Sequence, residues 1–168
     1  MEKILQILVV FALIMLVVNR FIRGREQRFR EYVLSGHISL PLPGDLYREL
    51  LSVVVGEDVI AADPDNRLFF RPGPENTLVA ADKRTGVSLA SVAMGEEIDA
   101  VLFDPLSRLI YCYSLAGLLT VLRQSGRSSY RIVQRMDVPR GGMQLSLDPH
   151  SGKIYLQAEA LVYVYAHV

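Results

Sequence analysis

The chain has 168 residues, of which 51% are hydrophobic, and its 18 Lys and Arg balance its 18 Asp and Glu. This length holds one domain of ordinary size with an appendage. The apolar content excludes a disordered chain, and the single cysteine, Cys112, excludes a disulfide scaffold. The balanced charge excludes a strongly basic nucleic-acid binder, so no nucleic-acid partner is expected.

A long apolar run lies at the N-terminal end. Residues 4–18 are all apolar except Gln6. As a helix they span about 22 Å, and extension to Ile22 gives about 28 Å, close to the hydrocarbon thickness of about 30 Å. Arg20 would then reach the headgroups through its long side chain.

Three interpretations of this run compete. A cleaved signal peptide needs a small-x-small site, and none follows Val18. A buried core helix in so small a domain would show a polar face. We favour a single transmembrane helix, with residues 1–22 as the anchor and residues 4–22 in the lipid bilayer.

An arginine-rich flank follows the run, and residues 23–46 are assigned to a juxtamembrane segment and linker. The positive-inside bias places this flank in the cytoplasm. We therefore predict a single-pass protein of the inner or cytoplasmic membrane with its main domain on the cytoplasmic side. The alternative is a periplasmic domain, with 4–18 as an uncleaved export signal. The side chains expected to contact anionic headgroups are Arg20, Arg23, Arg25, Arg28 and Arg30.

An Asp-Pro pair recurs in the rest of the chain. Asp63, Asp104 and Asp148 each precede a proline, at spacings of 41 and 44 residues. A basic residue follows each Asp at +4 or +5, and an aromatic residue follows at +7. Because Asp caps a turn through backbone amides and Pro fixes the next φ, we expect a structural role for all three aspartates.

The repeat divides residues 47–168 into three units. Their bounds are 47–86, 87–128 and 129–168, and each holds four strand candidates. In the second unit these are 87–94, 99–103, 108–114 and 117–123. A period of 40–45 residues with four strands is typical of a propeller blade. We therefore predict a mainly β fold of three propeller-like four-stranded blades after the N-terminal helix.

Two details of this assignment depend on the pattern. Residues 130–136 alternate between two faces, as a half-buried strand does. Residues 47–55 also show helical spacing, and the repeat register makes us favour a strand there.

The stretches Asp99–Tyr111, Tyr130–Gln134 and Leu145–Leu156 resemble blades of YVTN-repeat, lactonase-like β-propellers. The resemblance covers residues 47–168 and implies a part-propeller, because full members of that family have about seven blades. Propellers close with about four to eight blades, so three would leave sheet faces and edges open. A second copy, another protein or the segment 33–43 is expected to cover them.

Few residues suggest chemistry. The histidines are far apart in sequence, and Cys112 has no partner cysteine, so no metal site is expected. The resemblance implies a divalent metal held by acids and amides at a central channel, and the acids nearest the inner strands are Glu57, Asp58, Glu96, Glu97 and Asp99. We favour loop acids facing water. Cys112 lies within a predicted strand, where a buried, inert thiol is expected.

Arginines are also dense between 123 and 140. An acidic-partner or headgroup patch is one interpretation of them, and a solvated outer face is the one we favour. The members of this group are Arg123, Arg127, Arg131, Arg135 and Arg140.

These features predict a non-catalytic, membrane-anchored interaction or scaffold protein without a cofactor. We expect it to be an accessory subunit of a larger membrane complex, for which a respiratory or photosynthetic host is one possibility. Its partners would be other subunits or a second copy at the open blade edges. The alternatives are a lactonase-like hydrolase formed by dimerisation and an exported ligand-binding sensor.

Overall fold

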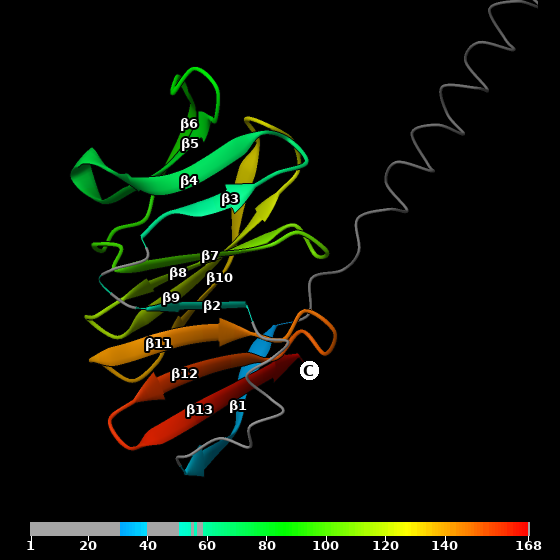
Figure 1. Ribbon diagram of the computed structural model, residues 1–168. Helices are drawn as coiled ribbons and strands as arrows, with labels where there is room; N and C mark the ends of the chain where they lie inside the picture. The colour runs from blue at the N-terminus through cyan, green and yellow to red at the C-terminus, as the bar shows by residue number, and fades with distance from the viewer. Residues whose placement is uncertain (1–30, 40–50, 55, 57–58, 168) are drawn as a thin grey trace, which may run out of the picture. The chain divides into compact units, whose positions relative to one another are not determined.

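The computed structural model describes residues 31–39, 51–54, 56 and 59–167, which belong to the unit Glu31–Val168. These residues form thirteen strands in three antiparallel sheets (Figure 1). The described part of the chain contains no helix long and apolar enough to cross a membrane. The predicted anchor, residues 1–22, and the five headgroup arginines lie outside the described residues.

The first two sheets are simple meanders, in which each strand pairs with the next along the chain. The first sheet consists of β3 (Ala61–Asp63), β4 (Leu68–Gly73), β5 (Thr77–Asp82) and β6 (Ser88–Ala93). A short 3-10 turn, Pro74–Asn76, joins β4 to β5. The second sheet consists of β7 (Ala100–Asp104), β8 (Leu109–Ser114), β9 (Leu118–Gln124) and β10 (Tyr130–Asp137).

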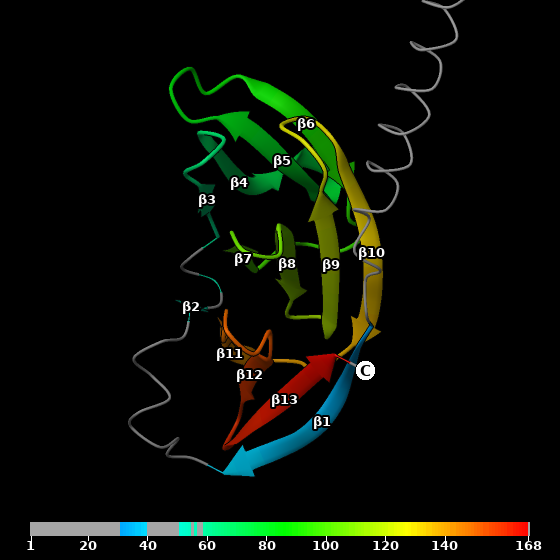
Figure 2. The ribbon, with the colours of Figure 1, turned by 90° about the vertical axis from the view of Figure 1, so that its right-hand side faces the viewer.

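The third sheet is assembled from both ends of the described chain. Its central strands are β11 (Gly142–Leu147), β12 (Ile154–Ala158) and β13 (Leu161–His167). Its outer strand is β1 (Tyr32–Ser39), which lies antiparallel beside β13 in both ribbon views (Figures 1 and 2). Its inner strand is β2 (Leu51–Val54), which pairs with β11.

The turns after the repeated aspartates have the predicted construction. An oxygen of Asp63 accepts a hydrogen bond from the backbone N–H of Asn66, at 3.2 Å. Asp104 and Asp148 accept from the N–H two residues on, each at 2.9 Å. Each turn ends with a residue at positive φ: Arg67 at 54°, Arg108 at 60° and Gly152 at 69°. The structural role predicted for the aspartates is therefore confirmed.

The strands are grouped differently from the sequence repeats. The strand expected to open the second unit is β6, which closes the first sheet, and the strand expected to open the third is β10, which closes the second. Both are joined to the preceding strand by a short turn, so pairing backwards closes a smaller loop. The third sheet takes its outer strand from the segment assigned to the linker 23–46.

The sheets pack in series through their faces. Phe70 of the first sheet lies 5.3 Å from Phe103 of the second, between ring centroids, and 5.9 Å from Tyr130. Every residue of β7 and β8 is buried, because the second sheet is covered on both faces. The inner strand β7 contacts β2, β3 and β11. The described residues therefore form a continuous core around the second sheet.

Candidate interaction site

A carboxylate joins the first sheet to the second. Asp63 is fully buried, and the guanidinium of Arg108 donates to both of its oxygens, at 2.7 and 3.2 Å. Gln124 donates its side-chain amide to the same carboxylate, at 2.9 Å. The guanidinium therefore binds the carboxylate in the bidentate geometry that this pair of planar groups favours. This contact is charge-assisted and bidentate, which makes it stronger than a hydrogen bond between neutral groups.

The charge of this carboxylate is stabilised by its donors. Burial alone would raise the pKa of Asp63, but hydrogen bonds from Asn66, Gln124 and Arg108 outweigh it and hold the pKa below its usual value. The guanidinium also lies over the Phe103 ring, 5.2 Å from its centroid. Asp63 is therefore ionised at neutral pH.

Two further polar contacts join the same sheets at their outer part. Arg127 donates to Asp82, at 2.7 Å, and Arg135 donates to the carbonyl of Met94, at 3.3 Å. Two of the five arginines between 123 and 140 therefore bind the neighbouring sheet. Arg131 is exposed on β10, as expected of a solvated outer face.

Tyrosines carry the contact between the second and third sheets. The hydroxyls of Tyr32 and Tyr111 lie 2.9 Å apart, and burial raises the pKa of Tyr32 to about 12. Tyr113 donates to the carbonyl of Pro139 at 2.9 Å and accepts from the N–H of Gly142 at 2.7 Å. A Cβ at position 142 would lie 2.8 Å from the Tyr113 hydroxyl, so glycine is required for this close approach.

The side-chain amide of Gln134 binds the backbone of β1 as a neighbouring strand would, through one accepted and one donated hydrogen bond. Gln134 of β10 accepts from the backbone N–H of Tyr32 and donates to its carbonyl, both at 2.8 Å. This two-point contact ties the outer strand of the third sheet to the outer strand of the second. Sequence reasoning missed it, because a glutamine on an alternating strand gives no signal of its partner.

The structure describes three of the five acids predicted near the inner strands. Glu96 and Glu97 are exposed in the connection between β6 and β7, while Asp99 accepts from the N–H of Leu115, at 2.7 Å. Glu57 and Asp58 lie outside the described residues. A groove of about 370 Å³ includes Glu75, Glu97 and Asp99 in its lining. In the part of the chain that the structure describes, no three His, Cys, Asp or Glu residues are placed to hold a metal ion.

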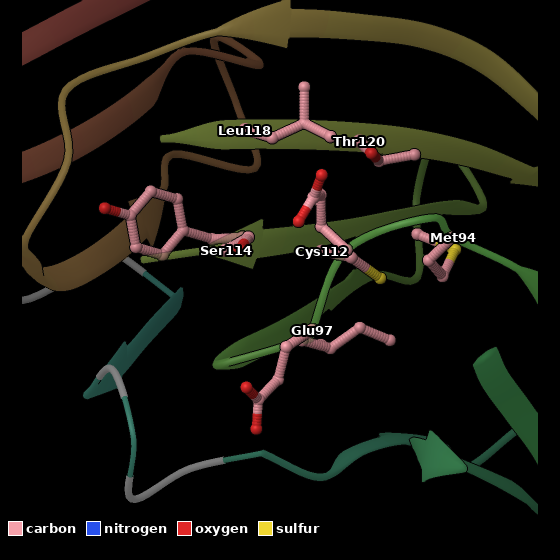
Figure 3. A pocket seen from close by; sticks show the side chains of 9 residues that line it. Met94, Glu97, Cys112, Ser114, Leu118 and Thr120 are labelled. Carbon is pink, nitrogen blue, oxygen red and sulfur yellow. The ribbon is translucent and has the colours of Figure 1, made fainter. Parts of the chain in front are cut away.

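Cys112 lines a small cavity between β8, β9 and the Met94–Ile98 connection. Figure 3 shows it with Met94, Glu97, Ser114 and Thr120 around the space, whose volume is about 10 Å³. This volume is at the limit for one water molecule. Burial raises the pKa of the Cys112 thiol, which keeps it protonated.

Cys112 is therefore expected to be unreactive in the folded chain. We predict that a maleimide modifies it at least about 100-fold more slowly in buffer than in denaturant, because reaction requires opening of the sheet. The mass shift over time measures the rate. A Ser128→Cys variant, with its added thiol in the exposed β9–β10 turn, is the control and should react rapidly. Equal rates for the two thiols would contradict the buried assignment.

Comparison with known proteins identifies the architecture. No family profile and no curated protein matches the sequence. A chain of the "Crystal Structure of Mitotic Checkpoint Complex" superposes with a TM-score of 0.53 at 15% identity, covering 66% of this chain and 36% of that chain.

The WD40 β-propeller domain of Doa1 superposes with a TM-score of 0.50 at 15% identity, covering 64% of this chain and 35% of that one. This chain therefore spans about a third of these structures. The likeness supports the propeller architecture without selecting the YVTN-repeat family. The three sheets of the described chain are arranged as successive blades of a β-propeller.

Proposed function

We propose that this protein is a non-catalytic, membrane-anchored interaction protein that serves as an accessory subunit of a larger membrane complex. The observation that carries the proposal is the outer face of the first sheet. Among the described residues, no other sheet packs on that face, and Ala62, Ser88 and Ser91 are exposed on it. A propeller blade is normally covered on both faces, so this one offers a surface for a partner.

Two further observations support binding rather than catalysis. The nucleophile candidate, Cys112, is buried with a raised thiol pKa. The buried carboxylates, Asp63 and Asp104, both cap turns, and Asp63 also binds the second sheet. One similar structure is titled as a complex, which places that protein in an assembly.

The membrane part of the proposal rests on the sequence. The apolar run 4–18 is long enough for a span when extended to Ile22, and the arginine flank that follows favours a cytoplasmic domain. In the proposed arrangement, residues 4–22 lie in the inner or cytoplasmic membrane. Arg20, Arg23, Arg25, Arg28 and Arg30 then contact its headgroups.

Gentle extraction of the tagged chain from its own membranes tests the subunit role. We expect a particle far larger than one or two copies, with other proteins present in fixed ratio on native mass measurement. A monomer or a pure homo-oligomer without companions would contradict the proposal. The tag is placed at the C-terminal end in one sample and at the N-terminal end in another, so that loss of companions through the tag is recognised.

Topology is tested by the Ser128→Cys variant. Because Cys112 is buried, the added thiol is the reporter, and a membrane-impermeant maleimide is applied to intact cells. We expect labelling only after the membrane is permeabilised. Labelling in intact cells would place the β domain outside the cytoplasm and leave the exported alternative.

A further inference from the structure

The contact at Asp63 uses two residues whose positions are fixed by the repeat. Arg108 is the positive-φ residue that ends the turn after Asp104. The backbone N–H of Gln124 donates to the carbonyl of Arg108, at 2.9 Å, which places the two side chains next to each other at one end of the second sheet. Both then donate to the carboxylate of the preceding sheet.

The first sheet has the same arrangement of two neighbouring side chains, but no described acid binds them. Arg67 ends the turn after Asp63 with a φ of 54°, and the N–H of Lys83 donates to the carbonyl of Arg67, at 2.8 Å. Arg67 and Lys83 therefore occupy the places of Arg108 and Gln124. Both side chains are exposed, and neither has a hydrogen bond or ion pair to a described residue. We call Arg67 and Lys83 the basic pair.

The face beside the basic pair suits the approach of another chain. Small side chains, Ala62, Ser88 and Ser91, are exposed there, and Phe69 is half-buried among them. They lie on the side of the sheet opposite Leu68 and Phe70, which face the second sheet. Two sheets pack about 10 Å apart, and small side chains on one of them favour this distance.

The third sheet carries the complementary acid. Asp148 is the last of the three repeated aspartates, and the same turn construction follows it. Its carboxylate accepts from the N–H of His150 and the hydroxyl of Ser151, both in its own turn. No Arg or Lys side chain of the described chain reaches it, although Asp63 receives Arg108 at the equivalent position. Asp148 is partly exposed, and a carboxylate has about four acceptor sites.

We propose that the basic pair of one copy binds the Asp148 turn of a second copy of this chain. The occupant is a second copy because one chain carries both halves of a contact that it already makes internally between its first and second sheets. The first and third sheets lie at opposite ends of the series (Figure 1). Two copies related by a two-fold axis then form the contact twice, and six sheets fall within the range of about four to eight that closes a propeller.

This inference rests on the proposed function in one respect, since both use the outer faces of the sheets as binding surfaces. It is tested on the full-length chain, purified in mild detergent, by sedimentation corrected for bound detergent. We expect a dimer in the wild type. Arg67→Glu and Asp148→Arg should each raise the dimer dissociation constant at least about tenfold, since each juxtaposes like charges.

Mixing the two single variants tests directly whether position 67 of one copy contacts position 148 of the other. The Arg67→Glu copy keeps Asp148 and the Asp148→Arg copy keeps Arg67, and the two exchanged charges face each other in the second contact. An equimolar mixture should therefore dimerise more tightly than either variant alone. The double variant should also dimerise, because its charges are exchanged. Arg84→Glu reverses an exposed charge in the β5–β6 turn of the same sheet and should behave as the wild type.

A monomeric wild type, single variants that dimerise as the wild type does, or a mixture that stays monomeric would each overturn the inference. Restoration on mixing shows that the single variants are folded. Companions in the native particle that persist with Arg67→Glu, together with a monomeric purified chain, would overturn this inference and keep the proposed function. A purified chain that dimerises as expected, together with a native particle that contains no other protein, would support this inference and contradict the proposed function.

Discussion

Asp63→Asn is expected to lower the free energy of unfolding by about 2–4 kcal/mol. The substitution keeps the shape of the side chain but removes the charge that the Arg108 guanidinium pairs with, at 2.7 Å. Asp63 is fully buried and Arg108 is 29% exposed, so the cost should lie at or below the range for a fully buried pair. Urea unfolding followed by tyrosine fluorescence measures it, since the chain has 8 Tyr and no Trp.

The matched control is Asp82→Asn, which removes the acid of the other ion pair between the same sheets. Arg127 is 51% exposed and Asp82 is 19% exposed, so water screens this pair. Asp82 also accepts hydrogen bonds from the backbone N–H groups of Arg84 and Thr85, at 3.0 and 2.9 Å, so we expect some loss of stability, clearly smaller than in Asp63→Asn. Equal loss of stability in the two variants would contradict the assignment of the Asp63 contact as the main polar contact between the sheets.

Asp63→Asn should also change how the free energy of unfolding depends on pH. The pKa of Asp63 is lower in the folded chain than in the unfolded chain, so its contribution to stability is present above the unfolded value and is lost as the pH falls through the folded one. As the pH falls below 3.8, the ordinary pKa of an aspartate, the wild type should therefore lose more stability than Asp63→Asn. The slope should persist in part, because hydrogen bonds from the Thr85 backbone N–H and from Arg127 lower the pKa of Asp82 to about 2, and that carboxyl remains in both chains. Parallel pH profiles would contradict the prediction.

Most strands were predictable from sequence because each has its own local signal, whereas β1 lies in the segment assigned to the linker. Residues 99–103, 108–114 and 117–123 were expected as strands, and β7, β8 and β9 lie there within one or two residues. The grouping of the strands into sheets was harder to predict, because a repeating pattern does not show which strand begins each sheet. The phase depends on which connections are tight enough to form hairpins, and the turn after Asp82, closed by Gly86 at a φ of 72°, is one of them.

The candidate interaction site also has a part that was predictable from sequence and a part that was not. The turn role of the aspartates follows from Asp-Pro chemistry and was predictable, whereas the choice of Arg108 as the partner of Asp63 depends on how two sheets pack. Gln124 and Gln134 gave no signal at all, because an amide is common on strands and its partner lies far away in sequence. Long-range pairing also explains β1, whose partner β13 lies at the other end of the chain.

Tyr32→Ala is the substitution in β1 with the largest expected effect, about 3–5 kcal/mol of unfolding free energy. The Tyr32 side chain is 3% exposed, and its ring meets Tyr111 edge-on, with 6.0 Å between centroids. Alanine leaves a cavity at the contact between the second and third sheets and leaves the Tyr111 hydroxyl without this partner. The outer strand of the third sheet should therefore separate more readily.

Hydrogen exchange distinguishes loss of β1 from general loosening. In Tyr32→Ala, amides of β1 and of the facing edge of β13 should exchange faster by a larger factor than those of β4 and β5 in the first sheet, because β13 is the one described strand with which β1 pairs. Val33→Ala is the control, since the neighbouring side chain is 45% exposed and its loss should be nearly neutral. Equal protection changes in the first and third sheets would mean that Tyr32 supports the whole core, and that the sheets unfold as one cooperative unit in which β1 has no separate opening.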